Sequence, residues 1–228
     1  MKFTFDLKNE FEYEKHRQLL YGLRNVWGGA IDGHIAEFGT MSGRSASILA
    51  EGLSFYLDER AEKDIKHKIK PRKLYLFDSF LGLPEAEEEA DILAPEVKTG
   101  IWGRSTCKGL TAEQLRNKLN SFLPDDKIII HEGWFEDTLP TLPNDIQFAF
   151  VHIDCDLYKS TLDILNYLFN NEALADGAML FFDDWNSNYA SYKFGQRRAW
   201  NESTEKYNIK YSDCGEYAGT SWKFIIHK

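Results

Sequence analysis

The alternation of apolar and polar positions divides this chain into two kinds of segment. Short apolar runs that end at turn residues predict strands buried on both faces of a parallel sheet. Such runs occupy residues 35–38, 73–77, 127–131, 147–153, 178–182, 209–211 and 222–226. Helices are predicted between them, at about residues 9–27, 45–56, 158–169 and 191–206, and another begins in a capping-box motif at Thr111.

Strands and helices alternate, which predicts an α/β protein with parallel strands and right-handed crossovers. Only a loop separates the last two strands, so these two should be antiparallel to each other. The length of 228 residues favours a single domain, 1–228, with an N-terminal helical segment at 1–30. The 82–109 segment is too long for an ordinary connection and is predicted to be an active-site lid. The alternative is a disordered acidic loop, which its run of three glutamates at 87–89 favours.

Charge and composition narrow the class of partner. The formal net charge of −9 and the pI near 5.2 argue against non-specific binding to nucleic acid or to a membrane surface. No stretch approaches the ~20 apolar residues that span a bilayer, and the first residues have no signal-peptide pattern. The 3 cysteines lack metal or redox spacing. We therefore expect a cytoplasmic protein that acts on a small molecule, and a homo-oligomer is one assembly that the sequence allows.

Carboxylates follow two of the predicted strands. Asp154 and Asp156 end the run that begins at Val151, and Asp183 and Asp184 end the next apolar run. Carboxyl ends of strands form the ligand crevice of an open α/β sheet, so these acids can converge. Acids that converge repel one another unless a cation neutralises them, and oxygen ligands suit Mg²⁺, Ca²⁺ or Mn²⁺. The sequence predicts a metal site at Asp154, Asp183 and Asp184; the alternative is that each acid caps a helix or turn.

The first three strand tips carry a different set of residues. Gly39 and Gly43 lie in the turn after the first strand, Asp78 ends the second strand, and Gly133 and Trp134 follow the third. The glycine spacing matches neither a GxGxxG motif nor a P-loop. An acid at the second tip can bind ribose hydroxyls, and an aromatic ring at the third can stack on adenine. Together they predict an adenosine pocket, although the acid could instead cap a turn and the tryptophan could be rim packing.

The residues at these tips resemble a known family. The chain is similar to class I S-adenosylmethionine-dependent methyltransferases and, more narrowly, to the macrocin O-methyltransferase family, whose members methylate sugar hydroxyls on antibiotics. The similarity rests on four segments in the expected order: residues 37–46, 77–84, 152–161 and 181–185. The family's glycine turn often reads Cys-Gly-Val-x-x-Gly-Gly, from which Phe38 and Arg44 depart.

The resemblance implies a Rossmann-like fold, with a seven-stranded, mostly parallel sheet, an antiparallel terminal strand and helices on both faces. It implies S-adenosyl-L-methionine and Mg²⁺ as cofactors, and it assigns the metal to Asp154, Asp183 and Asp184. The general base would be Asp156, with His131 as a rival, whereas Asp156 could instead cap the following helix. The residues expected to bind the cofactor are Glu37, Gly39, Thr40, Gly43, Ser45, Asp78, Ser79, Gly133, Trp134 and Asp154.

The function expected from the sequence is a Mg²⁺-dependent methyl transfer to a hydroxyl of a sugar or glycosylated metabolite. One alternative is a catechol-type O-methyltransferase that acts on an aromatic diol, for which a flat apolar acceptor slot would be the distinguishing feature. A second alternative, from a different class, is a nucleoside-binding module without catalysis. The sequence names neither the acceptor nor the hydroxyl that is methylated.

Overall fold

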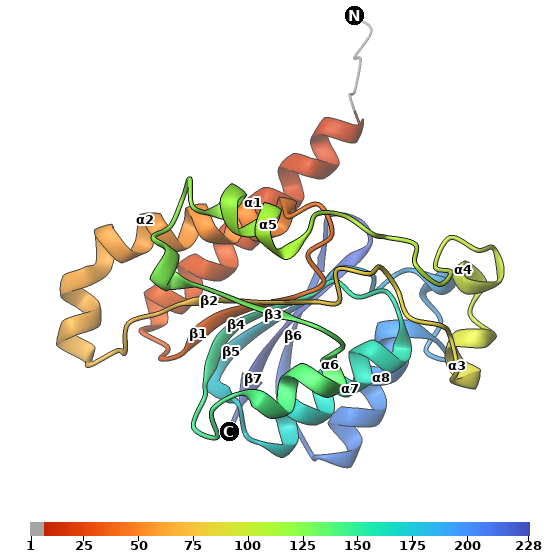
Figure 1. Cartoon of the computed structure of the whole chain (residues 1–228). Coiled ribbons are helices and arrows are strands. Elements are labelled where there is room, and N and C mark those ends of the chain that lie inside the picture. The colour runs from red at the N-terminus through yellow and green to blue at the C-terminus, as the bar shows by residue number, and fades with distance from the viewer. Residues whose placement is uncertain (1–6) are drawn as a thin grey trace, which may run out of the picture.

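Seven strands form one mixed sheet in the order β3-β2-β1-β4-β5-β7-β6 (Figure 1). The strands are β1 (His34–Phe38), β2 (Leu74–Asp78), β3 (Ile128–Glu132), β4 (Phe148–Ile153), β5 (Leu174–Phe182), β6 (Lys210–Tyr217) and β7 (Ser221–His227). This computed structural model describes the backbone of residues 7–228 and the side chains of residues 12–57 and 66–228. Residues 1–6 of the predicted N-terminal segment, with the chain start on which the targeting prediction rests, lie outside the described residues.

The strand directions confirm the predicted topology. Strands β1 to β5 run parallel, and β7 runs antiparallel to both of its neighbours, β5 and β6. β5 begins at Leu174, earlier than the predicted 178. The apolar pattern did not reveal this start, because residues 175–177 are half-buried or exposed. β6, in the antiparallel hairpin at the end of the chain, is also longer than the apolar run at 209–211 that predicted it, because most of its residues are exposed.

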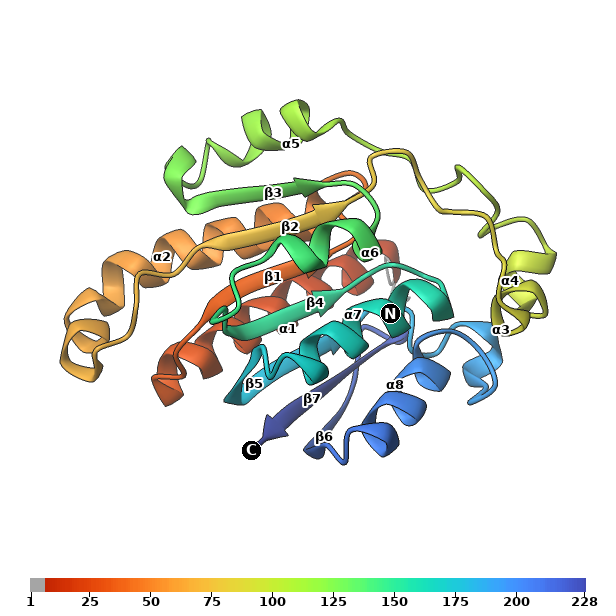
Figure 2. The ribbon, with the colours of Figure 1, turned by 60° about the horizontal axis from the view of Figure 1, so that its bottom comes forward.

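Helices cover both faces of the sheet, as expected (Figure 2). One face carries α1 (Leu7–Gly29), α2 (Arg44–His67) and α5 (Ala112–Leu119). The other carries α6 (Phe135–Thr138), α7 (Tyr158–Asn170) and α8 (Gly195–Lys206). Each face buries its own apolar cluster, so the strands between them are apolar on both sides. The predicted capping box begins α5, where Thr111 and Gln114 exchange hydrogen bonds.

The 82–109 segment is folded against the carboxyl edge of the sheet. It contains two short helices, α3 (Glu89–Ile92) and α4 (Pro95–Lys98), which lie beyond the strand tips in Figure 2. Its two ends pair, since Leu83 N donates to Thr106 O and Ser105 N donates to Leu83 O, both at 2.9 Å. Trp102 is 7 % exposed and packs with Leu83. These contacts describe an ordered segment rather than a disordered acidic loop, whereas its role as a lid stays a prediction.

The carboxyl ends of β1 to β5 point toward the same edge, beside this segment (Figure 2). Among the helices that the structure describes, none is both long enough and apolar enough to cross a membrane.

Candidate functional site

A cavity of about 820 Å³ opens at the carboxyl edge of the sheet. Most of the residues predicted from the sequence line it: Gly39, Thr40, Ser45, Asp78, Ser79, Gly133, Trp134, Asp154, Asp156 and Asp183. The structure does not place four others in its lining: Glu37, Gly43, His131 and Asp184. The parallel topology thus gathers the predicted glycine turn, acid, aromatic residue and carboxylates into one cavity.

Gly39 joins the first strand tip to the fourth. Its φ is +86°, and a Cβ at this position would lie 1.7 Å from the carbonyl oxygen of Asp154. Any other residue would therefore push the β4 tip away from the β1 turn. At Gly43 a Cβ would lie 2.6 Å from Leu115 on α5. The close approach at Gly43 is therefore made by a side chain of α5.

Asp78 holds the glycine turn in place. Its Oδ2 accepts hydrogen bonds from Thr40 N (2.7 Å), Thr40 Oγ1 (3.0 Å) and Met41 N (3.2 Å), and its Oδ1 accepts one from Phe80 N at 2.7 Å. The turn-capping alternative is thus part of its role, and the carboxylate also faces the cavity. A carboxylate has about four acceptor directions, so Oδ1 retains capacity for a further donor. The ribose assignment stays a prediction.

Glu37 faces the interior between two strands. Its side chain is fully buried, and its Oε1 lies 2.9 Å from Nδ1 of His152, which is opposite it in the β1–β4 register. Burial by itself would lower the pKa of His152, but Asp183 and Glu37 outweigh it and raise that pKa to about 10. The two carboxylates thus favour the protonated form of His152, and Glu37 contacts this histidine rather than facing the cavity.

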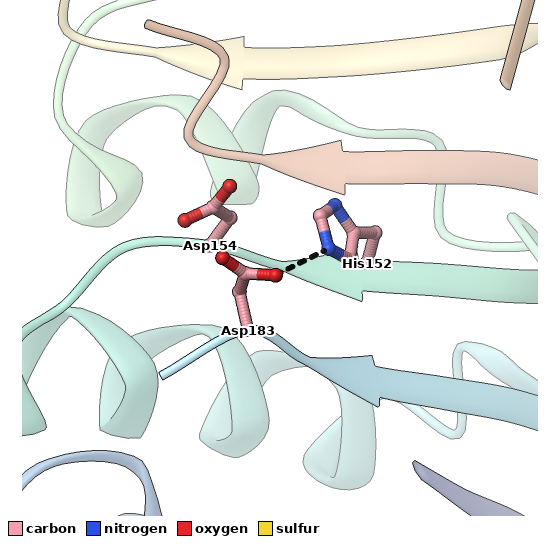
Figure 3. Close-up of side chains that lie close together, drawn as sticks. All are labelled: His152, Asp154 and Asp183. Carbon is pink, nitrogen blue, oxygen red and sulfur yellow. Dashed lines mark ion pairs between the residues drawn. The ribbon is translucent and has the colours of Figure 1, made fainter. Parts of the chain in front are cut away.

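Two of the three predicted metal ligands come together with this histidine. One donor atom from each of His152, Asp154 and Asp183 lies within 4.8 Å of the other two (Figure 3). The His152 Nε2 to Asp183 Oδ1 distance is 3.7 Å, which is an ion pair but too long for a hydrogen bond. Burial, followed by the charges of Asp183 and Asp184, raises the pKa of Asp154 well above its usual range.

The donor set fits a hard divalent cation in part. Nδ1 of His152 is held by Glu37 at 2.9 Å, so only Nε2 could ligate, and it could do so only from the neutral imidazole. The carboxylates of Asp154 and Asp183 do fit, because Mg²⁺ is commonly bound by one or two carboxylates and keeps several waters. Burial would raise the pKa of Asp183, but the facing His152 and Lys15 outweigh it and lower the pKa to about 2. Asp183 is thus already ionised and able to ligate.

Asp184 and Asp156 form a second pair beside the first. Asp156 N lies 3.3 Å from Asp184 Oδ2, and Asp156 has a φ of +61°. Burial, followed by the charges of Asp154 and Asp183, raises the pKa of Asp156 to about 8. The Asp184 backbone N–H donates to Gln196 Oε1 at 2.9 Å, which fixes the tip of β5. The third predicted metal ligand is therefore close to the cluster but not part of the donor group that surrounds Asp154.

Asp156 does not cap α7, which was the alternative reading of this residue. The helix begins after Leu157, whose side chain makes no capping hydrogen bond. Asp91, in the 82–109 segment, accepts from the N–H groups of Tyr158 (2.7 Å) and Lys159 (3.0 Å) instead. The carboxylate of Asp156 is thus left facing the cavity, as a general base requires.

His131 does not reach the cavity. It is opposite Phe77 in the β2–β3 register, and its ring stacks on Phe77 at 4.7 Å and on Tyr75 at 6.0 Å. Side chains alternate between the faces of a strand, so a residue in register with a core phenylalanine points to the same face. The geometry therefore does not support His131 as the general base.

Lys15 is a site residue that sequence reasoning missed. It belongs to α1, lines the cavity, and places its Nζ 2.5 Å from Asp183 Oδ2. From the same helix, Glu12 forms an ion pair with Arg44, the first residue of α2. Lys15 is far in the sequence from the strand-tip acids, and no local pattern around it indicates such a role. The contact depends on where α1 packs on the sheet.

Residues 14–211 match the sequence profile of the macrocin-O-methyltransferase (TylF) family. The chain belongs to this family. It is 30% identical over 164 residues to demethyldecarbamoylnovobiocin O-methyltransferase of Streptomyces niveus, which covers 72% of this chain and 56% of that protein. It is 29% identical over 168 residues to 8-demethyl-8-(2,3-dimethoxy-alpha-L-rhamnosyl)-tetracenomycin-C 4'-O-methyltransferase of Streptomyces olivaceus, covering 73% and 58%.

The fold of this TylF-family chain is also that of a solved relative. It superposes on the O-methyltransferase NovP with a TM-score of 0.72 and 23% sequence identity, over 94% of this chain and 80% of that one. The class I methyltransferase fold expected from the sequence is therefore confirmed. The chain spans just over half the length of the curated relatives that it matches.

Proposed function

We propose that this protein transfers a methyl group from S-adenosylmethionine to a hydroxyl of a sugar or glycosylated small molecule, with a divalent cation at the strand-tip carboxylates. One observation carries the proposal. In a chain of the TylF family, a single cavity joins the glycine turn, Asp78 and Trp134 on one side to Asp154, Asp156 and Asp183 on the other. The first set suits a nucleoside and the second suits a cation with a hydroxyl acceptor.

The cofactor half is built from the first three strand tips. Asp78 would accept from ribose hydroxyls through the remaining capacity of Oδ1, and Trp134 would cover the adenine. The tight contact of Gly39 with the β4 tip brings this half next to Asp154. The sulfonium would therefore lie between the adenosine pocket and the carboxylates.

The reaction moves the methyl carbon from the sulfonium sulfur to the acceptor oxygen, and the hydroxyl proton leaves. Asp156 would receive that proton, because it lines the cavity next to the carboxylates that would hold the cation. Asp154 and Asp183 would hold the cation. The cation would polarise the acceptor hydroxyl and help to orient it. The products are S-adenosylhomocysteine and the methyl ether.

Two features support a sugar rather than an aromatic diol as the acceptor. The cavity lining includes charged side chains from several elements: Glu85, Glu87, Glu88, Glu136, Lys159 and Asp163. Such groups hydrogen-bond hydroxyls, whereas a flat apolar slot would be expected for a catechol. The named acceptor of the Streptomyces olivaceus relative carries a rhamnosyl group, which is consistent with a sugar.

The test is a transfer assay with S-adenosylmethionine, Mg²⁺ and a panel of glycosides and catechols, followed by mass spectrometry. We expect a product heavier by one CH₂ group from a glycoside, and its loss after chelation of the cation. Asp156→Asn should keep cofactor binding and lower turnover by about 10²–10⁴-fold. Failure to bind S-adenosylmethionine would contradict the proposal as a whole. Full activity after chelation would contradict only the proposed role of the cation.

A further inference from the structure

Lys15 places a positive charge next to a carboxylate that the proposed cation would need. Its Nζ is 2.5 Å from Asp183 Oδ2, and its side chain is only 16% exposed. The charges of Asp154 and Asp184 also act on this ammonium. Lys15 comes from α1, so one helix packed on a face of the sheet supplies a counter-ion to the strand tips.

Both oxygens of Asp183 face protein donors. Oδ1 lies 3.3 Å from Ser221 Oγ and 3.7 Å from His152 Nε2, and Oδ2 is bound by Lys15. Ser221 and His152 are fully buried on strands β7 and β4. Their backbones are fixed in the sheet, and Ser221 Oγ also donates to the backbone oxygen of Asp183 at 2.9 Å.

Lys15 differs from these two partners because it can move. Its ammonium stands on a flexible four-carbon chain and borders the cavity. A divalent cation that binds Asp183 through Oδ2 would meet a like charge at contact distance. The Lys15 ammonium is therefore the group that such a cation would displace from Asp183.

We propose that Lys15 is a tethered counter-ion which competes with the divalent cation for Asp183 and so sets the affinity of the metal site. This inference rests on the proposed function for the presence of a cation, but it concerns binding rather than methyl transfer. When the cation binds, the ammonium moves into the cavity and the ion pair between Lys15 of α1 and Asp183, which follows β5, is broken. Glu12–Arg44 and the Gln18–Lys223 hydrogen bond still hold the helix.

The test is the binding of Mg²⁺ to the full chain by isothermal titration, without cofactor or acceptor. Lys15→Met keeps the apolar stem and removes the charge, and we expect about tenfold or tighter binding, since unit charges this close interact strongly. Lys15→Gln should also bind more tightly than the wild type. Lys223→Met is the matched control. It removes a contact to the same helix, at Gln18, while its ammonium faces Tyr217, and it should keep wild-type affinity.

The outcomes separate this inference from the proposed function. Equal or weaker Mg²⁺ binding by both Lys15 variants overturns the inference alone, and methyl transfer could still proceed. If wild type and both variants all fail to bind Mg²⁺, the cation in the proposed function falls as well. Tighter binding by Lys223→Met would mean that loosening α1, rather than removing the charge, controls affinity, and would also overturn it. Mg²⁺-induced thermal stabilisation of each variant gives a second readout if one variant folds poorly.

Discussion

At the scale of single residues, Asp78 both holds the glycine turn and lines the cavity. Three donors from Thr40 and Met41 converge on one of its oxygens and hold the glycine turn. The other oxygen accepts from Phe80 N and keeps capacity for a hydroxyl. A carboxylate at this tip was predictable from the sequence. Its bonds to the turn were not, because they join residues 38 positions apart.

We expect Asp78→Ala to weaken S-adenosylmethionine binding at least several-fold. Hydrogen bonds to a charged group are worth roughly 1.5–3 kcal/mol each, and the variant would also loosen the turn that we expect to contact the cofactor. Isothermal titration measures the affinity, and circular dichroism checks that the variant is folded. Wild-type affinity in a folded variant would contradict the ribose assignment.

The pair Glu37–His152 is a second contact between single residues that the sequence could not predict. His152 lies in the apolar run at residues 147–153, and its side chain is fully buried. The sequence could not reveal that Glu37 and Asp183 face its two nitrogens, at 2.9 and 3.7 Å. Register between strands, rather than any local pattern, makes Glu37 a partner of the histidine instead of a cofactor ligand.

At the scale of elements, the 82–109 segment is tied to α7 through one carboxylate. Asp91 is 1% exposed and accepts the first two N–H groups of the helix, which have no partner within it. The helix dipole adds to this interaction, since a negative charge is favourable at an N-terminus. The segment therefore borders the cavity and caps the helix that follows the Asp154 strand.

We expect Asp91→Ala to lower the free energy of unfolding by about 1–2 kcal/mol, the usual cost of losing an N-cap. It should also make the 82–109 segment more open to limited proteolysis. The matched control is Glu89→Ala, an exposed acid two residues away, which should change neither quantity appreciably. Equal protease sensitivity of the two variants would mean that Asp91 does not anchor the segment.

At the scale of the whole molecule, the antiparallel end of the sheet is held by an aromatic cluster. Trp200 on α8 is 1% exposed and stacks on Phe224 at 4.2 Å, and Phe182 meets it edge-on at 5.3 Å. This cluster joins β5, β7 and α8. The β5 tip carries Asp183, so packing at this end also positions the site.

We expect Trp200→Ala to destabilise the fold by about 3–5 kcal/mol, the range for truncating a buried aromatic side chain. Chemical denaturation followed by circular dichroism measures this difference. Tyr192→Ala removes an aromatic ring that is 69% exposed and should cost less than about 0.5 kcal/mol. Similar losses in both variants would contradict the importance of the buried cluster.

The sequence by itself determined the order of strands and helices, the parallel sheet with its closing hairpin, and the acids and glycines at the strand tips. These features follow from local patterns, and the topology of a parallel sheet then brings all the carboxyl ends to one edge. Only the tertiary structure decided which groups face one another at that edge. Lys15 meets Asp183 across 168 positions, Glu37 meets His152 across 115, and Asp91 caps α7 across 67. Such contacts depend on strand register and helix packing, which balance the buried charges only once the chain has folded.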